Sequence, residues 1–347
     1  MDTAAGDKIK KAVGRSVPVQ VLFAGWASLV LEDDQGKLTI TGDESSSEVE
    51  LICELSELVV ADPLVKCYGW ESLQGFLLAS GKVVGLGRSG SKHIFLEKAK
   101  DVAACGLSAD HLTVAIDKDS GHLFQWTASK PNAQLLQPPW IENIKFDRIW
   151  AGEAHLLALA SNGDLYSWGS GRHGQLGHGD LVSEEHPKVI ESLQGIRITS
   201  AACGSSFSIV LSETGDVYTF GLNDHGQLGI GAEGAGKSNT AFAQLIEFPI
   251  GNHDEEDNDV NIVKVACGTA HSVVIDDQGQ VWSCGWGKYG QLGPQETPTE
   301  ASTPKLSSRV LSVIPDQYTF QRVARLEGHS VQARGLVCGL WNTFLWT

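Results

Sequence analysis

Short apolar runs alternate with tight polar turns along most of this 347-residue chain. In one clear stretch, the apolar run 156–160 is followed by the turn Asn162-Gly163 and by a second run over 165–168. Two such runs across an Asn-Gly turn are typical of a β-hairpin. The pattern therefore predicts short antiparallel strands throughout the chain, with little helix.

The same order of residues occurs three times in the middle of the chain. Each copy has an anchor glycine, then a hairpin glycine, and ends in Gly-Gln-Leu-Gly. The anchor glycines are Gly152, Gly204 and Gly268, the hairpin glycines are Gly163, Gly215 and Gly279, and the closing sequences are 174–177, 226–229 and 290–293. Such self-similarity is the signature of a fold built from one repeated unit, and it favours a binding surface over an enzyme.

Weaker copies lie on both sides of the three clear ones. They cover 24–42, 69–87 and 105–126, and a fragment at 337–346 begins a further copy. Four short strands per copy, arranged around a centre, make the blades of a β-propeller. The count predicts an all-β, seven-bladed propeller whose last blade is closed by strands from both chain ends. Residues 1–17 contain no matching segment, so we expect this last blade to be incompletely closed.

The repeats leave little of the chain for a second domain. We expect a flexible N-terminal segment over 1–17 and a single propeller domain over 18–347. Polar stretches at 43–50, 230–261 and 294–330 are expected to be flexible loops of this domain. An acidic run, 254–259, most often means a solvated loop, but it could attract a basic partner.

Composition limits the classes of partner. The chain has 26 Lys and Arg against 42 Asp and Glu, a formal net charge of −16. Direct nucleic-acid binding is disfavoured, because it normally needs a basic face. No apolar run reaches transmembrane length, and the N-terminus lacks the apolar core of a signal peptide. We expect a monomer of the nucleus and cytoplasm with no membrane contact.

The seven cysteines show no Cys-x-x-Cys pair. Four of them directly precede the anchor glycine of a copy: Cys105, Cys203, Cys267 and Cys338. This repeated position indicates small buried thiols in a reducing compartment, rather than disulfides or a structural metal.

The motif of anchor glycine, His or Phe three residues later, Gly-x-Val-Tyr/Trp-x-aromatic-Gly and Gly-Gln-Leu-Gly resembles the regulator-of-chromosome-condensation repeat family. The resemblance is close over 150–293 and weak over 18–126. It implies a seven-bladed β-propeller in which the sequence repeats are offset from the blades. It says little about function, because one fold hosts unrelated activities.

Three segments resemble a small single-domain subgroup of that family: 168–179, 285–293 and 338–343. The subgroup includes a chromatin-associated member that partners a JmjC-type lysine demethylase or hydroxylase. A fungal relative, the α-tubulin suppressor, pairs instead with a small zinc protein that serves tRNA wobble-uridine and diphthamide modification. Both partner classes stay open.

The repeated glycines have a structural explanation. Gly163, Gly215 and Gly279 are expected at positive φ in hairpin turns, and the three anchor glycines are expected to allow close backbone approach. No lysine follows the glycine-rich segments at the spacing of a phosphate-binding loop. We therefore expect no nucleotide cofactor.

No catalytic constellation is evident. His155 and His271 stand three residues after an anchor glycine, where other copies have Phe207 and Asn342. A position that accepts Phe or Asn serves packing or hydrogen bonding rather than acid–base chemistry. The histidines also lack metal-ligand spacing, so neither catalysis nor a metal site is expected.

The variable residues before each Gly-Gln-Leu-Gly are the best candidates for partner binding. Equivalent loops project from the same propeller face, and aromatic and arginine side chains on a rigid face are typical of interface hot spots. The alternative is that these loops are simply polar and solvated. The candidates are Arg172, His173, Asp224, His225, Trp286, Lys288 and Tyr289, together with Trp341, which could instead be core of the last blade.

Two classes of function follow from these features. The first is a non-catalytic adaptor that binds and regulates a partner enzyme, with a JmjC-type oxygenase preferred over the small zinc protein. The second is nucleotide exchange on a small GTPase, as in the founding member of the family. That member has a basic N-terminal tail and an inserted wedge hairpin, whereas this chain offers only Lys8, Lys10, Lys11 and Arg15 at its start.

Overall fold

The structure is a computed structural model of the chain. It describes residues 19–24, 28–33, 38–42, 62–69, 73–86, 92–106, 111–127, 129–231, 238–249, 260–293, 315–323 and 333–346. The expected flexible segments 1–17 and 43–50 and the acidic run 254–259 lie outside these ranges.

The chain packs as two compact units. One consists of residues 1–171 and 182–197 with residue 346, and the other consists of residues 172–181 and 198–345 with residue 347. The single domain expected over 18–347 therefore remains a prediction.

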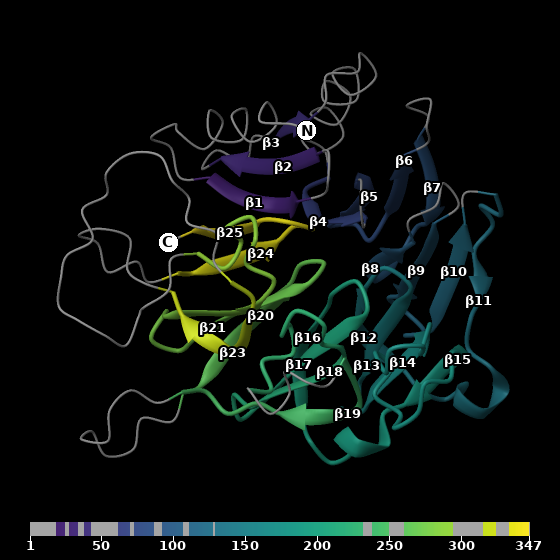
Figure 1. The fold of residues 1–347 in the computed structure, drawn as a ribbon. Helices are drawn as coiled ribbons and strands as arrows, with labels where there is room; N and C mark the ends of the chain where they lie inside the picture. The colour runs from purple at the N-terminus through teal and green to yellow at the C-terminus, as the bar shows by residue number, and fades with distance from the viewer. Residues whose placement is uncertain are drawn as a thin grey trace, which may run out of the picture. The chain divides into compact units, whose positions relative to one another are not determined.

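The first unit holds four antiparallel sheets, each made of strands that follow one another in the chain (Figure 1). Their order is β1-β2-β3, β4-β5-β6-β7, β11-β10-β9-β8 and β12-β13-β14-β15. The strands are β1 (Val19–Ala24), β2 (Ser28–Asp33), β3 (Leu38–Gly42), β4 (Leu64–Gly69), β5 (Leu73–Leu78), β6 (Val83–Leu86), β7 (Lys92–Leu96), β8 (Ala99–Cys105), β9 (Leu112–Asp117), β10 (Leu123–Thr127), β11 (Gln134–Leu135), β12 (Phe146–Ala151), β13 (His155–Ala160), β14 (Leu165–Gly169) and β15 (Glu184–Val189).

The second unit holds three sheets, β16-β17-β18-β19, β20-β21-β22-β23 and β24-β25. Its strands are β16 (Ile198–Cys203), β17 (Phe207–Ser212), β18 (Val217–Leu222), β19 (Asn239–Leu245), β20 (Ile262–Cys267), β21 (His271–Asp276), β22 (Val281–Gly285), β23 (Gln317–Arg322), β24 (Gly335–Cys338) and β25 (Thr343–Trp346). The all-β expectation is confirmed. Of the seven sheets formed by the described residues, five have four strands, the first has three and the last has two.

Helix is nearly absent from the described ranges. The two helices there are three-residue 3-10 turns at Pro139–Ile141 and Glu191–Leu193. No helix in this part of the chain is long and apolar enough to cross a membrane.

Two segments expected to be loops contain a strand. β19 lies within 230–261 and β23 lies within 294–330, so the expectation of continuous loops is wrong at these strands. Each is the fourth strand of its sheet and pairs through backbone hydrogen bonds with the third, β18 or β22. The residues of β19 are exposed or half-buried, so this strand needs no regular apolar pattern. Without that pattern, the strand could not be predicted from its sequence.

The hairpin between the second and third strands has the same geometry in all three clear copies. Gly163, Gly215 and Gly279 have φ of +94°, +85° and +76°, a conformation that residues with a Cβ adopt only at a cost. Each donates its N–H to the carbonyl three residues earlier, over 2.9, 3.3 and 3.0 Å. The second strands that precede these turns, β13, β17 and β21, are buried at all six positions, which explains their near-continuous apolar runs.

The Gly-Gln-Leu-Gly sequences fasten each loop to the next sheet. The side-chain Oε1 atoms of Gln175, Gln227 and Gln291 each accept the backbone N–H two residues earlier at 2.9 Å. The backbone carbonyls of the same glutamines accept hydroxyl hydrogens from the second strand of the following sheet. The donors are Ser208 in β17 at 3.0 Å, Ser272 in β21 at 2.7 Å and Thr343 in β25 at 3.0 Å.

The glycine that opens this sequence is sterically required. A Cβ on Gly226 would lie 2.5 Å from the carbonyl oxygen of Gln317 and 2.7 Å from Cα of Tyr318. Gly226→Ala should therefore lower the free energy of unfolding by about 3 kcal/mol, since both positive φ and backbone overlap are penalised. Urea denaturation followed by tryptophan fluorescence measures this loss.

The matched control is Gly195→Ala. Gly195 has nearly the same φ, +81° against +82° at Gly226, but nothing lies within 4 Å of its Cβ position. It should lose only about 1 kcal/mol, the cost of the backbone conformation alone. Equal losses in the two variants would show that backbone overlap at Gly226 is unimportant.

Candidate partner-binding site

Three equivalent loops, residues 170–173, 222–225 and 286–289, connect the third strand of a sheet to Gly-Gln-Leu-Gly. Each begins with a backbone hydrogen bond to the turn before the second strand of its own sheet. The donors Ser170, Leu222 and Trp286 bond to the carbonyls of Ala154, Ser206 and Ala270 over 2.8, 2.9 and 2.8 Å. The backbone of these loops is thus held at both ends, and their side chains carry the differences among the copies.

In the second unit the last two of these loops meet the turn before β25. His225, Trp286, Tyr289 and Trp341 form an aromatic cluster there. The imidazole of His225 stacks on Trp286 with ring centroids 5.0 Å apart and planes at 20°. Trp286 meets Tyr289 and Trp341 edge to face at 5.3 and 5.0 Å, and Tyr289 meets Trp341 at 6.0 Å. Residues from three successive sheets therefore make one surface.

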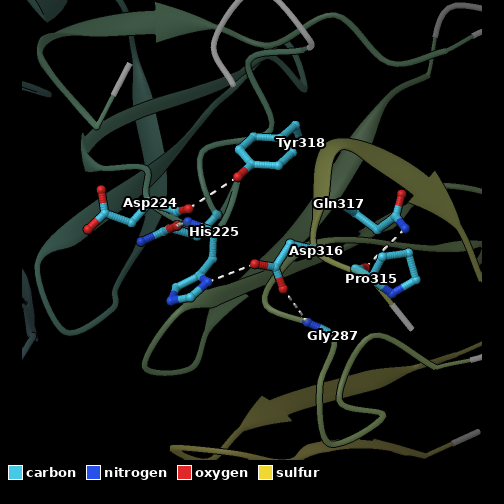
Figure 2. Close-up of polar contacts among 8 residues, drawn as sticks. Asp224, His225, Gly287, Pro315, Asp316, Gln317 and Tyr318 are labelled. Carbon is cyan, nitrogen blue, oxygen red and sulfur yellow. Dashed lines mark hydrogen bonds and ion pairs between the residues drawn. The ribbon is translucent and has the colours of Figure 1, made fainter. Parts of the chain in front are cut away.

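A carboxylate outside the repeat motif fixes the histidine in this cluster (Figure 2). Asp316, directly before β23, lies 2.8 Å from Nδ1 of His225 through one oxygen and accepts the N–H of Gly287 at 3.4 Å through the other. The Tyr318 hydroxyl donates to the backbone carbonyl of Asp224 at 3.2 Å. Asp316 was missed from sequence because it falls in a segment expected to be a loop, and its only signal is the carboxylate itself.

The aromatic cluster is partly open to solvent. Tyr289 is 57% exposed, and the other three rings are half-buried. The ammonium of Lys288 lies 5.6 Å from the centroid of the Tyr289 ring, at a cation–π distance. Asp224 is exposed beside His225. The surface therefore combines exposed aromatic area with both signs of charge.

Most of the candidates from sequence meet in this cluster, and two do not. The structure joins His225, Trp286, Lys288, Tyr289 and Trp341, with Asp224 adjacent in the chain. Arg172 is exposed and His173 is half-buried on the equivalent loop 170–173. Within the described residues the structure brings neither of them into the aromatic cluster, so their part in binding remains a prediction.

The buried histidines belong to the core. His155 and His271 are 0% and 1% exposed. Burial lowers the pKa of His271 to about 4, so this side chain is neutral at physiological pH. Its Nε2 lies 3.1 Å from the hydroxyl of Thr343 in the last sheet. A neutral ring enclosed in this way is suited to packing rather than to proton transfer with a substrate.

The anchor glycines make room for that packing. A Cβ on Gly204 would meet the ring of Phe207 at 1.9 Å, and one on Gly268 would meet the ring of His271 at 2.0 Å. Close approach was expected from another stretch of backbone, but the nearest atoms belong to the aromatic side chain three residues later. A Cβ on Gly268 would also lie 2.7 Å from the backbone oxygen of Gly339.

The cysteines in the described part of the chain form no disulfide, and four of the six are buried while Cys267 and Cys338 are half-buried. Burial raises the pKa of the Cys67, Cys105 and Cys338 thiols to about 12, and it raises the pKa values of Cys267 and Cys284 well above their ordinary range. Thiols held protonated are poor nucleophiles and poor metal ligands. Within the described ranges no group of three or more His, Cys, Asp or Glu side chains could hold a metal ion.

Comparison with known proteins gives a family match. The sequence model of the regulator of chromosome condensation (RCC1) repeat matches residues 162–211, 214–275 and 278–343, together just over half of the chain. A second model of the same repeat matches 198–227 and 262–291. RCC1 domain-containing protein 1 of Mus musculus is 31% identical over 252 residues, which cover 63% of this chain. The chain spans only 59% of the length of that protein.

Solved structures are similar to this chain over most of its length. Prp20p of Saccharomyces cerevisiae, described for its binding to Gsp1p and histones, aligns with a TM-score of 0.63 at 18% identity, covering 92% of this chain and 80% of its own. Human WBSCR16 aligns with a TM-score of 0.59 at 17% identity, covering 95% and 72%. At this identity the likeness shows the fold alone. The expected all-β propeller with seven blades is confirmed, and within the described residues the last sheet is β24 with β25.

Acid should destabilise the protein through His271. The unfolded chain takes up a proton at the ordinary histidine pKa of 6.5, whereas the folded protein takes it up only near 4. This residue therefore leaves stability unchanged above pH 6.5 and lowers the free energy of unfolding by about 1.4 kcal/mol per pH unit between 6.5 and 4. His271→Phe, which copies Phe207 of the neighbouring sheet, should remove that slope.

Urea denaturation at steps between pH 7.5 and 4.5 measures the difference between the wild type and this variant. The exposed His186 provides the control as His186→Gln, which should retain the wild-type dependence. A His271→Phe curve parallel to the wild-type curve would contradict the assignment.

Proposed function

Because the chain belongs to the RCC1 repeat family, we propose that it is a non-catalytic adaptor that binds and regulates a partner enzyme. The observation that carries the proposal is the aromatic cluster, in which residues of three sheets form one partly exposed surface. Rigid tryptophan and tyrosine side chains at the centre of a patch are the usual anchors of protein interfaces. The loop backbone that carries them is already fixed, so little conformational entropy opposes binding.

The placement of perturbed ionisable groups supports a binding role over an enzymatic one. Among the described residues, the pKa values that depart most from their ordinary range belong to His271, Tyr68 and the thiols, and these side chains are buried or half-buried. Catalytic acids, bases and nucleophiles with shifted pKa values are normally reachable from a cleft.

For the partner we propose a JmjC-type oxygenase, which would give the protein a role in chromatin regulation in the nucleus and cytoplasm. The support is the resemblance of 168–179, 285–293 and 338–343 to the subgroup with such a partner. The 31% identity to RCC1 domain-containing protein 1 supports the family but says nothing of the partner. A small zinc protein of tRNA or diphthamide modification is the alternative, and a small GTPase is the third.

The aromatic cluster predicts a residue-specific loss of binding. Tyr289→Ala should weaken capture of the purified partner enzyme by about 30-fold or more, since truncation of an interface anchor costs about 2 kcal/mol or more. The melting temperature should change little, because the side chain is largely exposed. Biolayer interferometry in parallel with a JmjC oxygenase, a small zinc protein of this class and a nucleotide-free small GTPase measures the loss and identifies the partner class.

The matched control is Phe242→Ala in β19. Phe242 is also 57% exposed, so the two variants remove aromatic surface of equal accessibility. The control should bind as the wild type does. Equal binding by both variants would show that the interface lies elsewhere, and binding to the nucleotide-free GTPase alone would replace the adaptor role with nucleotide exchange.

A further inference from the structure

We propose that the aromatic cluster takes an arginine side chain from a basic segment of the partner, with the guanidinium stacked on Tyr289 in the place now held by Lys288. This inference rests on the proposed function, because it names the chemistry that the adaptor face would recognise.

The arrangement of the rings favours a stacked cation over an enclosed one. The centroids of Trp286, Tyr289 and Trp341 lie 5.0 to 6.0 Å apart with interplanar angles of 70° to 79°, so the rings contact one another directly. An ammonium surrounded by three aromatic faces would need wider separations, since a cation stands within about 6 Å of each centroid but not inside the rings. Of these three rings, Tyr289 is the exposed one, and Trp286 and Trp341 are half-buried.

Two basic groups of the chain already lie against these rings. Lys288 stands over Tyr289 at 5.6 Å, and His225 stacks on Trp286 while bonded to Asp316. Lys288 is exposed, so its ammonium can leave the ring and be solvated at little cost. His225 is half-buried and held by a carboxylate, so it stays in place. Tyr289 is therefore the ring whose basic neighbour can be exchanged.

Charge around the aromatic cluster suits a basic ligand. Asp224 lies exposed on one of its loops, whereas both oxygens of Asp316, directly before β23, already face His225 and the N–H of Gly287. Lys288 and His225 are the basic side chains of the two loops. The chain as a whole carries −16, so its long-range field attracts cationic segments. When Lys288 leaves Tyr289, the exposed carboxylate of Asp224 and the net negative charge of the chain complement the incoming charge.

Arginine fits this surface better than lysine does. A guanidinium is planar and weakly hydrated, so it can stack on a tyrosine face while its N–H groups reach carboxylates. An ammonium is a compact, strongly hydrated charge that Lys288 already supplies. The aromatic cluster should therefore distinguish two peptides of the same charge.

The test compares fluorescein-labelled (Arg-Ser)4 and (Lys-Ser)4 peptides by fluorescence anisotropy with the full chain. In 150 mM NaCl the arginine peptide should bind about 3- to 5-fold more tightly, the factor expected for a cation–π contact at an exposed site. Tyr289→Leu should reduce this ratio to one, Tyr289→Phe should preserve it, and Phe242→Leu should leave it unchanged. Lys288→Gln should tighten binding of the arginine peptide.

Equal affinities for the two peptides, or a preference retained in Tyr289→Leu, would overturn the proposal and leave only attraction by net charge. The peptide result and the capture result fail separately. If peptide preference is absent while Tyr289→Ala still loses the partner enzyme, the face binds but not through arginine. If the peptide preference is present while Tyr289→Ala still captures the partner enzyme, the arginine site is supported, and the partner enzyme binds at another surface.

Discussion

The buried glutamine of each Gly-Gln-Leu-Gly determines where the functional surface can form. The side-chain oxygens of Gln227 and Gln291 accept the backbone N–H groups of His225 and Tyr289. The backbone carbonyls of the same glutamines accept hydroxyl hydrogens from the next sheet. Movement of the loop would leave these buried acceptor oxygens unpaired, which is costly, so the loop has little freedom to move. Within the second unit the repeat therefore fixes the loop backbone and joins each sheet to its successor with the same few atoms.

The backbone of these loops is the same in each copy, whereas their side chains differ and determine what can bind. Ser170, Leu222 and Trp286 occupy one equivalent position and make the same backbone hydrogen bond to the preceding turn. The side chains at this position range from a hydroxyl to an indole, while the bond lengths stay within 2.8 to 2.9 Å. Binding chemistry can thus change at one loop without disturbing the fold, which is why the repeat by itself does not reveal the partner.

How far the sequence predicts the structure depends on where each signal resides. Strand pairs, hairpin glycines and the candidates His225, Trp286 and Tyr289 follow from local patterns that recur in every clear copy. β19, β23 and Asp316 could not be found in this way, because an outer strand is held by pairing with its neighbour and needs no apolar run. The contact of Trp341 with Trp286 joins two sheets, and no local pattern contains it.

Lys288 gives the exposed aromatic surface a way to exist without a partner. A largely exposed tyrosine beside two indoles favours unwanted association, and the exposed ammonium over its face covers part of that area and adds charge. The contact is worth only about 0.5 to 1 kcal/mol at an exposed site, so a ligand that stacks better can replace it. Lys288 therefore covers the Tyr289 ring when no partner is bound, yet a ligand needs little free energy to displace it. This favours selective and reversible binding over permanent association.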